Sequence, residues 1–518
     1  MSNPVSNFQL EELSYSWSNR ILALSVAGIL FLTLYPFRFS FHAALPGTSS
    51  PFLLASGVKS SGAFNAFLNV MLFVPFGWGL SQKLRAKGKS TGATFLVTVA
   101  ASALFSYSIE FIQLYIPTRD SGWEDVFTNT TGGMLGYFAS EMVGRPVLSF
   151  VSRFEYRLEQ HLTPGRAFWV IPIYFAIWFA VSVPLQEQSR LSNWVSNPQL
   201  LVGNDASGHS DRAWKGRVSL LQFWDEPLPA GLARKITAGE KSADGVSTLL
   251  ARYEFSTVSP YQDQNKFLPA LSWTPSTPDM SFPGDVSLTG SSWLTSVSPV
   301  PSLVQTLQKV NQFSMQIVCA PAEIEGVDGR VVSLSQADGQ VDLILRQKES
   351  NLVFWFRTPL AIRRGQLALS VPDVFIPHEV RNILVSYDGS NLSFYINGER
   401  DARVYELTPG TPLAQLIRYI KTSELEGYTF IYYALVFVPA GVLLGVVARR
   451  LTSWNVVTAL FLGIAVLLPP ICLELLLLSV SGRAFALPNV LLSALLAMGG
   501  ILWINVDRKS RRIESLAA

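Results

Sequence analysis

Long apolar stretches alternate with short polar connections at both ends of the chain, while the middle of the chain is polar. A helix that crosses a bilayer needs about 17 to 25 predominantly apolar residues. Stretches of this length predict eight membrane-spanning helices, near residues 21–37, 63–82, 92–117, 123–143, 167–185, 428–448, 455–478 and 485–505. We expect the first to remain as a span, because its leader holds two acids and no signal-peptide cleavage site follows it.

Lysine and arginine gather in alternate connections between these stretches, and by the positive-inside rule such connections face the cytoplasm. We therefore expect both termini in the cytoplasm and residues 186–427 outside. The basic groups are Lys83, Arg85, Lys87 and Lys89; Arg145, Arg153, Arg157 and Arg166; Arg449 and Arg450; and Arg508, Lys509, Arg511 and Arg512.

The polar middle of the chain, residues 186–410, has short runs of alternating apolar and polar residues bounded by Gly, Asn and Asp. This pattern predicts strands, and "YDGS" and "INGE" are typical of hairpin turns. Strands are expected in "WKGRVSLLQFWDEPL", "RVVSLSQ", "VDLILRQ", "NLVFWFRT" and "RNILVSYDGSNLSFYINGER". We therefore predict an extracytoplasmic β-sandwich. Residues 235–310 carry no pattern that assigns an element.

Residues 411–427, "TPLAQLIRYIKTSELEG", begin with Thr-Pro and place apolar residues on one helical face. They predict an amphipathic helix at the outer membrane interface. The expected organisation is a first four-helix unit over 1–166, a fifth spanning helix over 167–185, the sandwich over 186–410, the interfacial helix over 411–427, and three spanning helices with a cytoplasmic tail over 428–518.

The composition agrees with a membrane protein, since 49% of residues are hydrophobic and only 15% are charged. A formal net charge of +3 without basic runs interleaved with aromatics gives no reason to expect nucleic acid as a partner. The two cysteines, Cys319 and Cys472, lie in different surroundings, so neither a disulfide framework nor a thiolate metal site is expected.

The chain contains an internal repeat, because "LFVPFG" at 72–77 returns as "VFVPAG" at 436–441. The offset is 437 − 73 = 364, and it also relates Glu110 to Glu474 and Arg119 to Arg483 without a gap. An even number of helices per copy gives both copies the same orientation, which predicts a parallel repeat. The sandwich is then an insertion into the outer loop of the second copy.

Polar residues in the first copy are predicted to meet near the outer ends of its helices, with Glu110 at the floor of a pocket and Arg119 at its rim. A charged group on a spanning helix costs about 2.5 to 3.5 kcal/mol, so it needs a partner or a water-filled cavity. The set can form a binding site, or it can join helices as packing contacts. The candidate residues are Asn69, Glu110, Gln113, Arg119, Asp125 and Asn129; the second copy has Tyr433, Leu477, Asn489 and Ser493 in place of Asn69, Gln113, Asp125 and Asn129.

The blocks "NVMLFVPFG" and "SIEFIQLYIPTRDSGWEDVFTNTTGG" resemble the VanZ-like family of bacterial membrane proteins over residues 21–143. The resemblance implies a bacterial cytoplasmic membrane protein, and it assigns the six candidate residues as the polar positions of the family. The founding member of that family is associated with resistance to the glycopeptide antibiotic teicoplanin. Because the second copy departs at four of the six positions, we expect any activity in the first.

The segment "VSYDGSNLSFYINGE" resembles the laminin G-like, concanavalin A-like sandwich family. "LLVGNDASGHSDRAWKGRVSLLQFWDEPL" looks like its closing strands yet comes first, which a circular permutation would explain. The resemblance implies carbohydrate or protein binding, sometimes through Ca²⁺, or hydrolysis of β-glucans. Binding is favoured over hydrolysis, because Glu323 and Glu325 run into a turn without the third acid that hydrolysis would use. Candidate Ca²⁺ ligands are Asn204, Asp205 and Asp388, although Asn-Asp and Asp-Gly are first of all turn residues.

We expect a membrane protein that recognises a cell-envelope ligand, a glycan or lipid-linked glycan, through the sandwich and the first-copy pocket. The family association adds resistance to a wall-directed antibiotic as an expectation. The alternatives are a membrane enzyme or transporter that acts on a lipid headgroup, and a structural scaffold. Metal-dependent catalysis is disfavoured, because none of the four histidines joins the predicted pocket.

Overall fold

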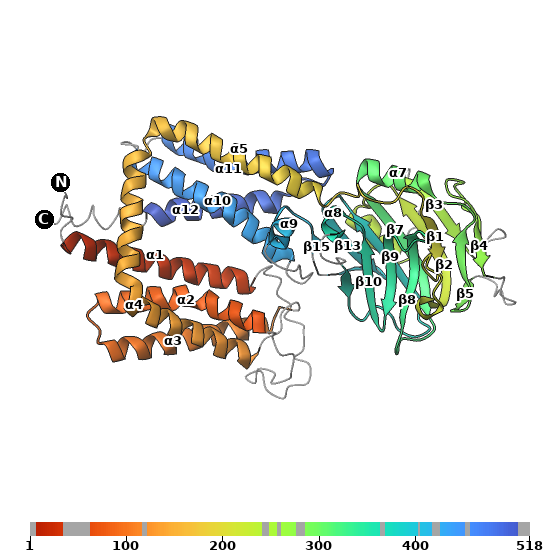
Figure 1. Ribbon diagram of the computed structural model, residues 1–518, viewed down its shortest axis with the longest axis horizontal. Coiled ribbons are helices and arrows are strands. Elements are labelled where there is room, and N and C mark those ends of the chain that lie inside the picture. The colour runs from red at the N-terminus through yellow and green to blue at the C-terminus, as the bar shows by residue number, and fades with distance from the viewer. Residues whose placement is uncertain are drawn as a thin grey trace. The chain divides into compact units, whose positions relative to one another are not determined.

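The computed structural model describes most of the chain (Figure 1). The described residues are 7–34, 63–116, 122–240, 248–255, 261–275, 285–362, 368–401, 403, 405–416, 425–450 and 456–505. They divide into two compact units: 1–172 with 439–462 and 497–518, and 173–438 with 463–496. Each unit is described by itself.

The first unit is built on four long helices, in which α2 packs against the other three and α3 also packs against α4. Apolar side chains from α1, α2 and α3 form its core, including Ile29, Phe73 and Ile109. At the start of α3 the Ser90 side chain accepts a hydrogen bond from the Ala93 amide, a helix N-cap. The helices are α1 (Asn7–Leu34), α2 (Ala63–Ala86), α3 (Thr91–Gln113) and α4 (Trp123–His161).

Helix α4 continues well beyond the predicted end at residue 143. At 39 residues its contour is about 58 Å by helical rise, whereas a hydrocarbon core is about 30 Å thick. Pro146 lies inside it, and the later, yellow part turns away from the direction of α2 and α3 (Figure 1). The basic connection after the fourth predicted span is therefore largely helical.

Four more long helices complete the helical part: α5 (Pro164–Glu187), α10 (Leu425–Arg450), α11 (Val456–Ser481) and α12 (Leu487–Asn505). In the first unit Ala167, Val446 and Ile504 belong to a small core. In the second unit Phe175 packs against Phe437, with ring centroids 5.8 Å apart.

Six of the described helices are long and apolar enough to cross a membrane: those within 17–34, 91–113, 165–187, 425–449, 459–481 and 487–505. The two remaining predicted spans fold as helices α2 and α4. Their crossing of the membrane stays a prediction.

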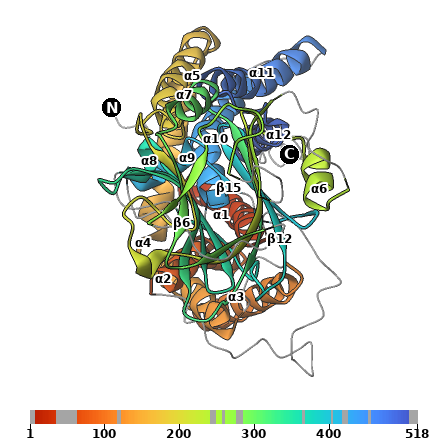
Figure 2. The ribbon, with the colours of Figure 1, turned by 90° about the vertical axis from the view of Figure 1, so that its right-hand side faces the viewer.

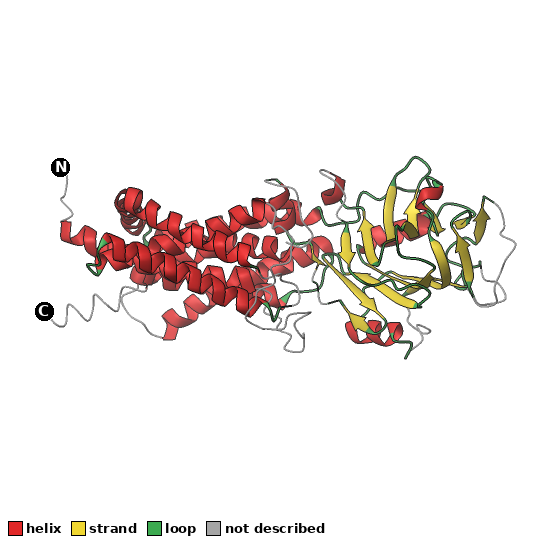
Figure 3. Cartoon of the chain, turned by 90° about the horizontal axis from the view of Figure 1, so that it is seen from below, coloured by secondary structure: helices red, strands yellow, loops and turns green. Residues whose placement is uncertain are grey.

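The polar middle of the chain forms two antiparallel sheets, and each quoted strand segment coincides with strands of the structure. In Figure 2, β6 and β12 mark the two layers. Figure 3 shows the strands gathered in one body with only short helices among them. The strands are β1 (Gln199–Val202), β2 (Lys215–Trp224), β3 (Leu249–Glu254), β4 (Leu271–Thr274), β5 (Val286–Thr289), β6 (Trp293–Ser296), β7 (Phe313–Pro321), β8 (Asp328–Ser335), β9 (Val341–Lys348), β10 (Asn351–Phe356), β11 (Leu369–Val371), β12 (Arg381–Tyr387), β13 (Asn391–Ile396), β14 (Glu399–Arg400) and β15 (Tyr405–Glu406).

The seven-stranded sheet has the order β11-β10-β9-β8-β1-β6-β4, and the path of the other sheet is β14-β13-β12-β7-β2-β3. Strands β5 and β15 pair with β2 and β13. Side chains from both sheets, among them Phe223, Phe313 and Phe354, fill one apolar core. At the predicted "INGE" turn Asn397 and Gly398 both have positive φ, as a tight hairpin requires.

Among its described residues the polar segment also contains five short helices. The region over 235–310, for which the sequence assigned no element, holds α7, the strands β3 to β6 and the end of α6. The predicted interfacial helix over 411–427 is described only as α9 and Leu416, since 417–424 lie outside the described residues and 425–427 begin α10. The short helices are η1 (Ser210–Arg212), α6 (Ala230–Thr237), α7 (Pro301–Val310), α8 (Pro359–Ile362) and α9 (Gly410–Gln415).

Candidate functional site

Glu110 is a buried carboxylate near the end of α3, with only 2% of its surface exposed. Its Oε2 accepts a hydrogen bond of 3.0 Å from the Gly122 amide, just before α4. The carboxylate therefore joins the last turn of one helix to the start of the next. A buried acid in a spanning helix is a marker of function unless its surroundings fully explain it.

The other predicted residues bridge pairs of helices. Asn69 Nδ2 on α2 donates to Asp125 Oδ1 on α4 at 2.6 Å. Gln113 Nε2 on α3 donates to the Thr33 carbonyl on α1 at 2.9 Å.

Asn129 Nδ2 on α4 donates to Ser106 Oγ on α3 at 2.9 Å. Asn129 and Gln113 are buried, whereas Asn69 and Asp125 are half-buried. Arg119 lies outside the described residues. Its predicted place at the rim of the pocket stays a prediction.

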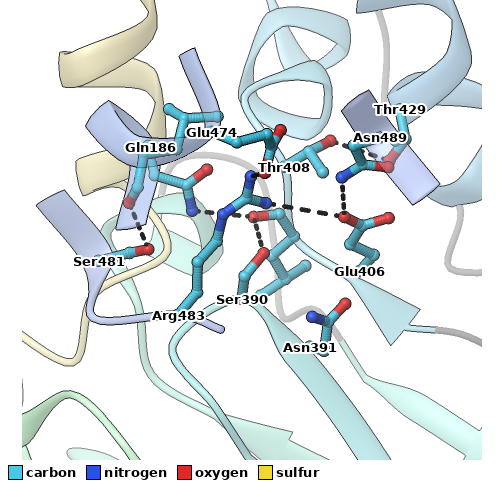
Figure 4. A network of polar contacts seen from close by, with 12 residues as sticks. Gln186, Ser390, Asn391, Glu406, Thr408, Thr429, Glu474, Ser481, Arg483 and Asn489 are labelled. Carbon is cyan, nitrogen blue, oxygen red and sulfur yellow. Dashed lines mark hydrogen bonds and ion pairs between the residues drawn. The ribbon is translucent and has the colours of Figure 1, made fainter. Parts of the chain in front are cut away.

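A second polar site lies in the second unit, among side chains of α10, α11, α12 and the connection between α11 and α12. Arg483, fully buried, donates through Nη2 to Glu474 Oε2, and the Tyr433 hydroxyl donates to Glu474 Oε1. The Glu474 carboxylate also accepts a hydrogen bond from the Ala486 backbone amide. Figure 4 shows the guanidinium directed at this carboxylate.

The sandwich contributes the second acid of this site. Glu406, on strand β15, places Oε1 at 3.7 Å from Arg483 Nη1 and accepts a hydrogen bond of 2.9 Å from Asn489 Nδ2 on α12 (Figure 4). Burial raises the pKa of Glu406 above its ordinary value, while Arg483 and Asn489 oppose that shift. The guanidinium thus lies between one carboxylate of the helices and one of the sandwich.

Further contacts hold the sandwich on the connection between α11 and α12. Asn311, which ends α7, donates from Nδ2 to the Ser481 carbonyl at 2.5 Å. Gln312 donates to the Gly482 carbonyl, and Arg190 donates to the Val480 carbonyl. A Cβ at Gly389 would meet the Ser481 carbonyl oxygen, so only glycine fits there. These contacts make the second site a docking point for the sandwich.

The two polar sites share backbone geometry at the offset of 364. Glu110 accepts from the amide of Gly122, and Glu474 accepts from that of Ala486. The amides of Asp125 and Asn489, which are equivalent by the offset, bond to the carbonyls of Gly122 and Ala486.

Helix packing follows the same offset. A Cβ at Gly77 would meet the Gly133 carbonyl, and one at Gly441 would meet that of Ala497. The second site could have been predicted from the sequence, because Glu474 and Arg483 are the equivalents of Glu110 and Arg119 at this offset.

The candidate Ca²⁺ ligands are engaged in their own turns. Asp388 Oδ1 accepts from the amides of Ser390 and Asn391, and Asp205 Oδ1 accepts from the amide of Ser207. Asn204 Oδ1 accepts from the Asp205 amide. Within the described part of the chain, no group of three or more His, Cys, Asp or Glu is arranged to hold a metal ion.

The fold and the polar sites define a multi-pass helical membrane protein that carries a β-sheet domain. Residues 10–144 match the family model described as VanZ/LLP1, so this segment is VanZ-like. No curated protein matches the chain. No solved structure matches it either.

Proposed function

We propose that the chain is a multi-pass protein of the bacterial cytoplasmic membrane that recognises a cell-envelope glycan or lipid-linked glycan. Its eight spanning helices form two four-helix units, with both termini in the cytoplasm and the sandwich outside. The Glu110 and Glu474 hydrogen bonds and the Gly77 and Gly441 packing contacts, all related by one offset, support the duplication. The sandwich is of the laminin G-like, concanavalin A-like kind, which its two antiparallel sheets support.

The two copies have different tasks in this proposal. The observation that carries the proposal is that Glu406, a residue of the same chain, occupies the second site, where its carboxylate contacts Arg483 and Asn489. An occupied site cannot take another ligand at that position, so the second copy anchors the sandwich. The first copy, with its own full set of polar residues, is the one that binds.

The chemistry of the first site favours a ligand rich in hydroxyl groups. Asn489 of the second copy donates a hydrogen bond to Glu406. The equivalent residue of the first copy is Asp125, whose carboxylate accepts a hydrogen bond from Asn69. A carboxylate repels a second anion but accepts hydrogen bonds from hydroxyls, and such charge-assisted bonds are the stronger ones. Sugar hydroxyls are donors of this kind.

Binding of fluorescently labelled lipid-linked glycan to the full-length protein in nanodiscs tests the proposal. We expect Asp125→Ala to weaken binding about tenfold, since losing a hydrogen bond to a charged group costs about 1.5 to 3 kcal/mol. Glu124→Gln, which removes the neighbouring acid of the same helical turn, is the matched control and should leave affinity unchanged. Equal affinities for wild type and Asp125→Ala would contradict the proposal.

A structural scaffold is the second candidate, because each described side-chain hydrogen bond of Asn69, Gln113 and Asn129 joins two helices. The scaffold predicts that Asp125→Ala lowers the yield of folded protein. A binding site predicts normal yield with lost binding. Size-exclusion profiles of the same preparations separate the two.

A further inference from the structure

Helix α3 has an inverted distribution of polarity. Its buried residues are polar with the single exception of Ile109: Thr94, Thr98, Ser102, Ser106, Glu110 and Gln113. Its exposed residues include Leu96, Val97 and Leu104. Buried hydroxyls four residues apart lie on one face of a helix. Glu110 follows Thr94 by 16 positions (110 − 94 = 16), so the stripe is about 24 Å long by helical rise, which is most of a hydrocarbon core about 30 Å thick.

Several atoms of this stripe lack protein partners. Ser102 Oγ donates to the Thr98 carbonyl, and Ser106 Oγ accepts from Asn129. The Oγ1 atoms of Thr94 and Thr98 and Oδ1 of Asn129 are buried without a hydrogen-bond partner. An unpaired buried polar atom costs about 1 to 3 kcal/mol, whereas an ordered water can satisfy it. Both threonines are fully buried, so their hydroxyls would need a partner inside the helix bundle, such as a water, to be satisfied.

Helix α4, which packs against α3, contributes small and polar residues beside the stripe. A Cβ at Gly133 on α4 would meet Ser102 Oγ, so α4 lies directly against this oxygen. Nearer the start of α3, the Tyr137 hydroxyl donates to the Thr91 carbonyl. Ser140 is bonded to Ser81 at 2.5 Å. Polar side chains therefore continue from the stripe toward the first residues of α3, next to the basic connection between α2 and α3.

The second copy gives an internal comparison. At the offset of 364, Thr98, Ser102 and Ser106 become Leu462, Val466 and Pro470. Thr94 is retained as Thr458, whereas Gly133, which faces Ser102, becomes Ala497. Gly441 lies against Ala497 as Gly77 lies against Gly133, so the packing of α10 on α12 matches that of α2 on α4. Three of the four buried hydroxyls of the stripe are therefore confined to the first copy.

We propose that this stripe is part of a hydrated path that carries protons across the membrane, between the cytoplasm and water at the outer pocket, with the carboxylate of Glu110 as the relay. Hydroxyls four residues apart on a helix are about 6 Å from one another, so one water between neighbours makes a continuous chain of hydrogen bonds. Hydronium at the cytoplasmic end gives up a proton, each hydroxyl or water along the chain accepts one proton and passes on another, and Glu110 is protonated. Glu110 then releases its proton to water on the outer side. The path goes beyond glycan recognition and does not depend on the identity of that ligand.

Proton uptake by liposomes that contain the full-length protein tests the path, with a potassium gradient and valinomycin as the driving force and an internal pH dye as the readout. We expect wild type to exceed protein-free liposomes. Thr98→Val, nearly isosteric, should lower the rate about tenfold, because it interrupts the hydrogen-bonded chain. Ser108→Ala, which removes an exposed hydroxyl of α3 bonded to the Leu104 carbonyl, is the matched control and should keep the wild-type rate.

Thr98→Ser keeps the hydroxyl and should retain proton uptake. It is the control that separates loss of the hydroxyl from misfolding as the cause of slow uptake in Thr98→Val. Wild-type uptake no faster than that of protein-free liposomes would overturn the proposal, and so would equal rates for Thr98→Val and wild type. Glycan binding by the same preparations is a separate readout. The failure of one proposal is therefore distinguishable from the failure of the other.

Discussion

Glu406 of the sandwich lies 3.7 Å from Arg483 of the helical part, across 77 positions of the chain (483 − 406 = 77). The guanidinium is fully buried and also donates to Glu474. Burial of three charged groups is costly unless each is compensated. The pairing therefore fixes the end of the sandwich on the connection between α11 and α12.

Arg483→Ala is expected to destabilise the protein strongly, because it leaves Glu474 and Glu406 buried without their cation. Breaking a buried ion pair by removing one partner costs about 3 to 5 kcal/mol. Thermal unfolding in detergent measures the loss. Arg217→Ala, which removes an ion pair with Asp285 at the surface of the sandwich, is the control and should cost less than about 1 kcal/mol. Similar losses in the two variants would be evidence against a structural role for Arg483.

Asn489→Asp tests why the second copy has an asparagine at the position where the first copy has Asp125. The new carboxylate would face Glu406, which now accepts a hydrogen bond from Asn489. We expect a loss of about 2 kcal/mol from repulsion and from the missing hydrogen bond, and recovery when Glu406→Gln is added. A double-mutant cycle of unfolding free energies measures the coupling. Strictly additive effects would show that the two side chains do not interact.

Asp342 gives the sandwich a predicted dependence on pH. Its side chain is fully buried; Oδ1 accepts from the Val195 amide at 2.9 Å, while Oδ2 has no partner. Burial raises the pKa of Asp342 from 3.8 to about 6, against the opposing effects of the Val195 amide and Arg357. Because the folded pKa exceeds the unfolded value, the carboxyl favours folding fully below about pH 4, and this contribution disappears as pH rises through about 6.

Asp342→Asn, which keeps the shape without the charge, should therefore raise the unfolding free energy by about 2 to 3 kcal/mol at pH 7.5. The difference from wild type should shrink toward zero at pH 4. Thermal unfolding of the full-length protein at both pH values checks the sign. An equal stabilisation by Asp342→Asn at pH 4 and pH 7.5 would contradict burial of the charged carboxylate as the cause.

Gly77→Ala should disrupt the packing of α2 on α4, since the added Cβ meets the Gly133 carbonyl. Overpacking of this kind costs about 1 to 3 kcal/mol. Gly441→Ala should have a similar effect against Ala497. Gly92→Ala on α3, where a Cβ meets nothing within 4 Å, should be tolerated. Thermal unfolding compares the three, and equal tolerance at all of them would refute the close approach.

The sequence predicts the strongly patterned elements well. The strands β8, β9, β10, β12 and β13 carry alternating residues and turn signals, and they appear where expected. The strands β4, β5 and β6 have four residues each. All four residues of β6 are buried, including Thr295 and Ser296, so no alternation marks it. Elements of this kind depend on partners distant in sequence.

For the polar sites, sequence predicts which residues are unusual but not which partners they find. Glu110 is conspicuous in an apolar helix, yet its bond to the Gly122 amide is a matter of backbone geometry. Glu406 lies in a strand of two residues and meets Asn489 across 83 positions. The hydroxyl stripe of α3 is concealed because Thr and Ser are ordinary residues in spanning helices. Only the packing shows that they are the buried side.

Binding of labelled lipid-linked glycan to a matched pair of variants tests the division of tasks between the two copies most directly. Asp125→Ala alters the first site, and Glu406→Gln alters the second. The account predicts affinity reduced about tenfold by Asp125→Ala and wild-type affinity in folded Glu406→Gln protein. Wild-type affinity in Asp125→Ala together with lost binding in folded Glu406→Gln protein would contradict it.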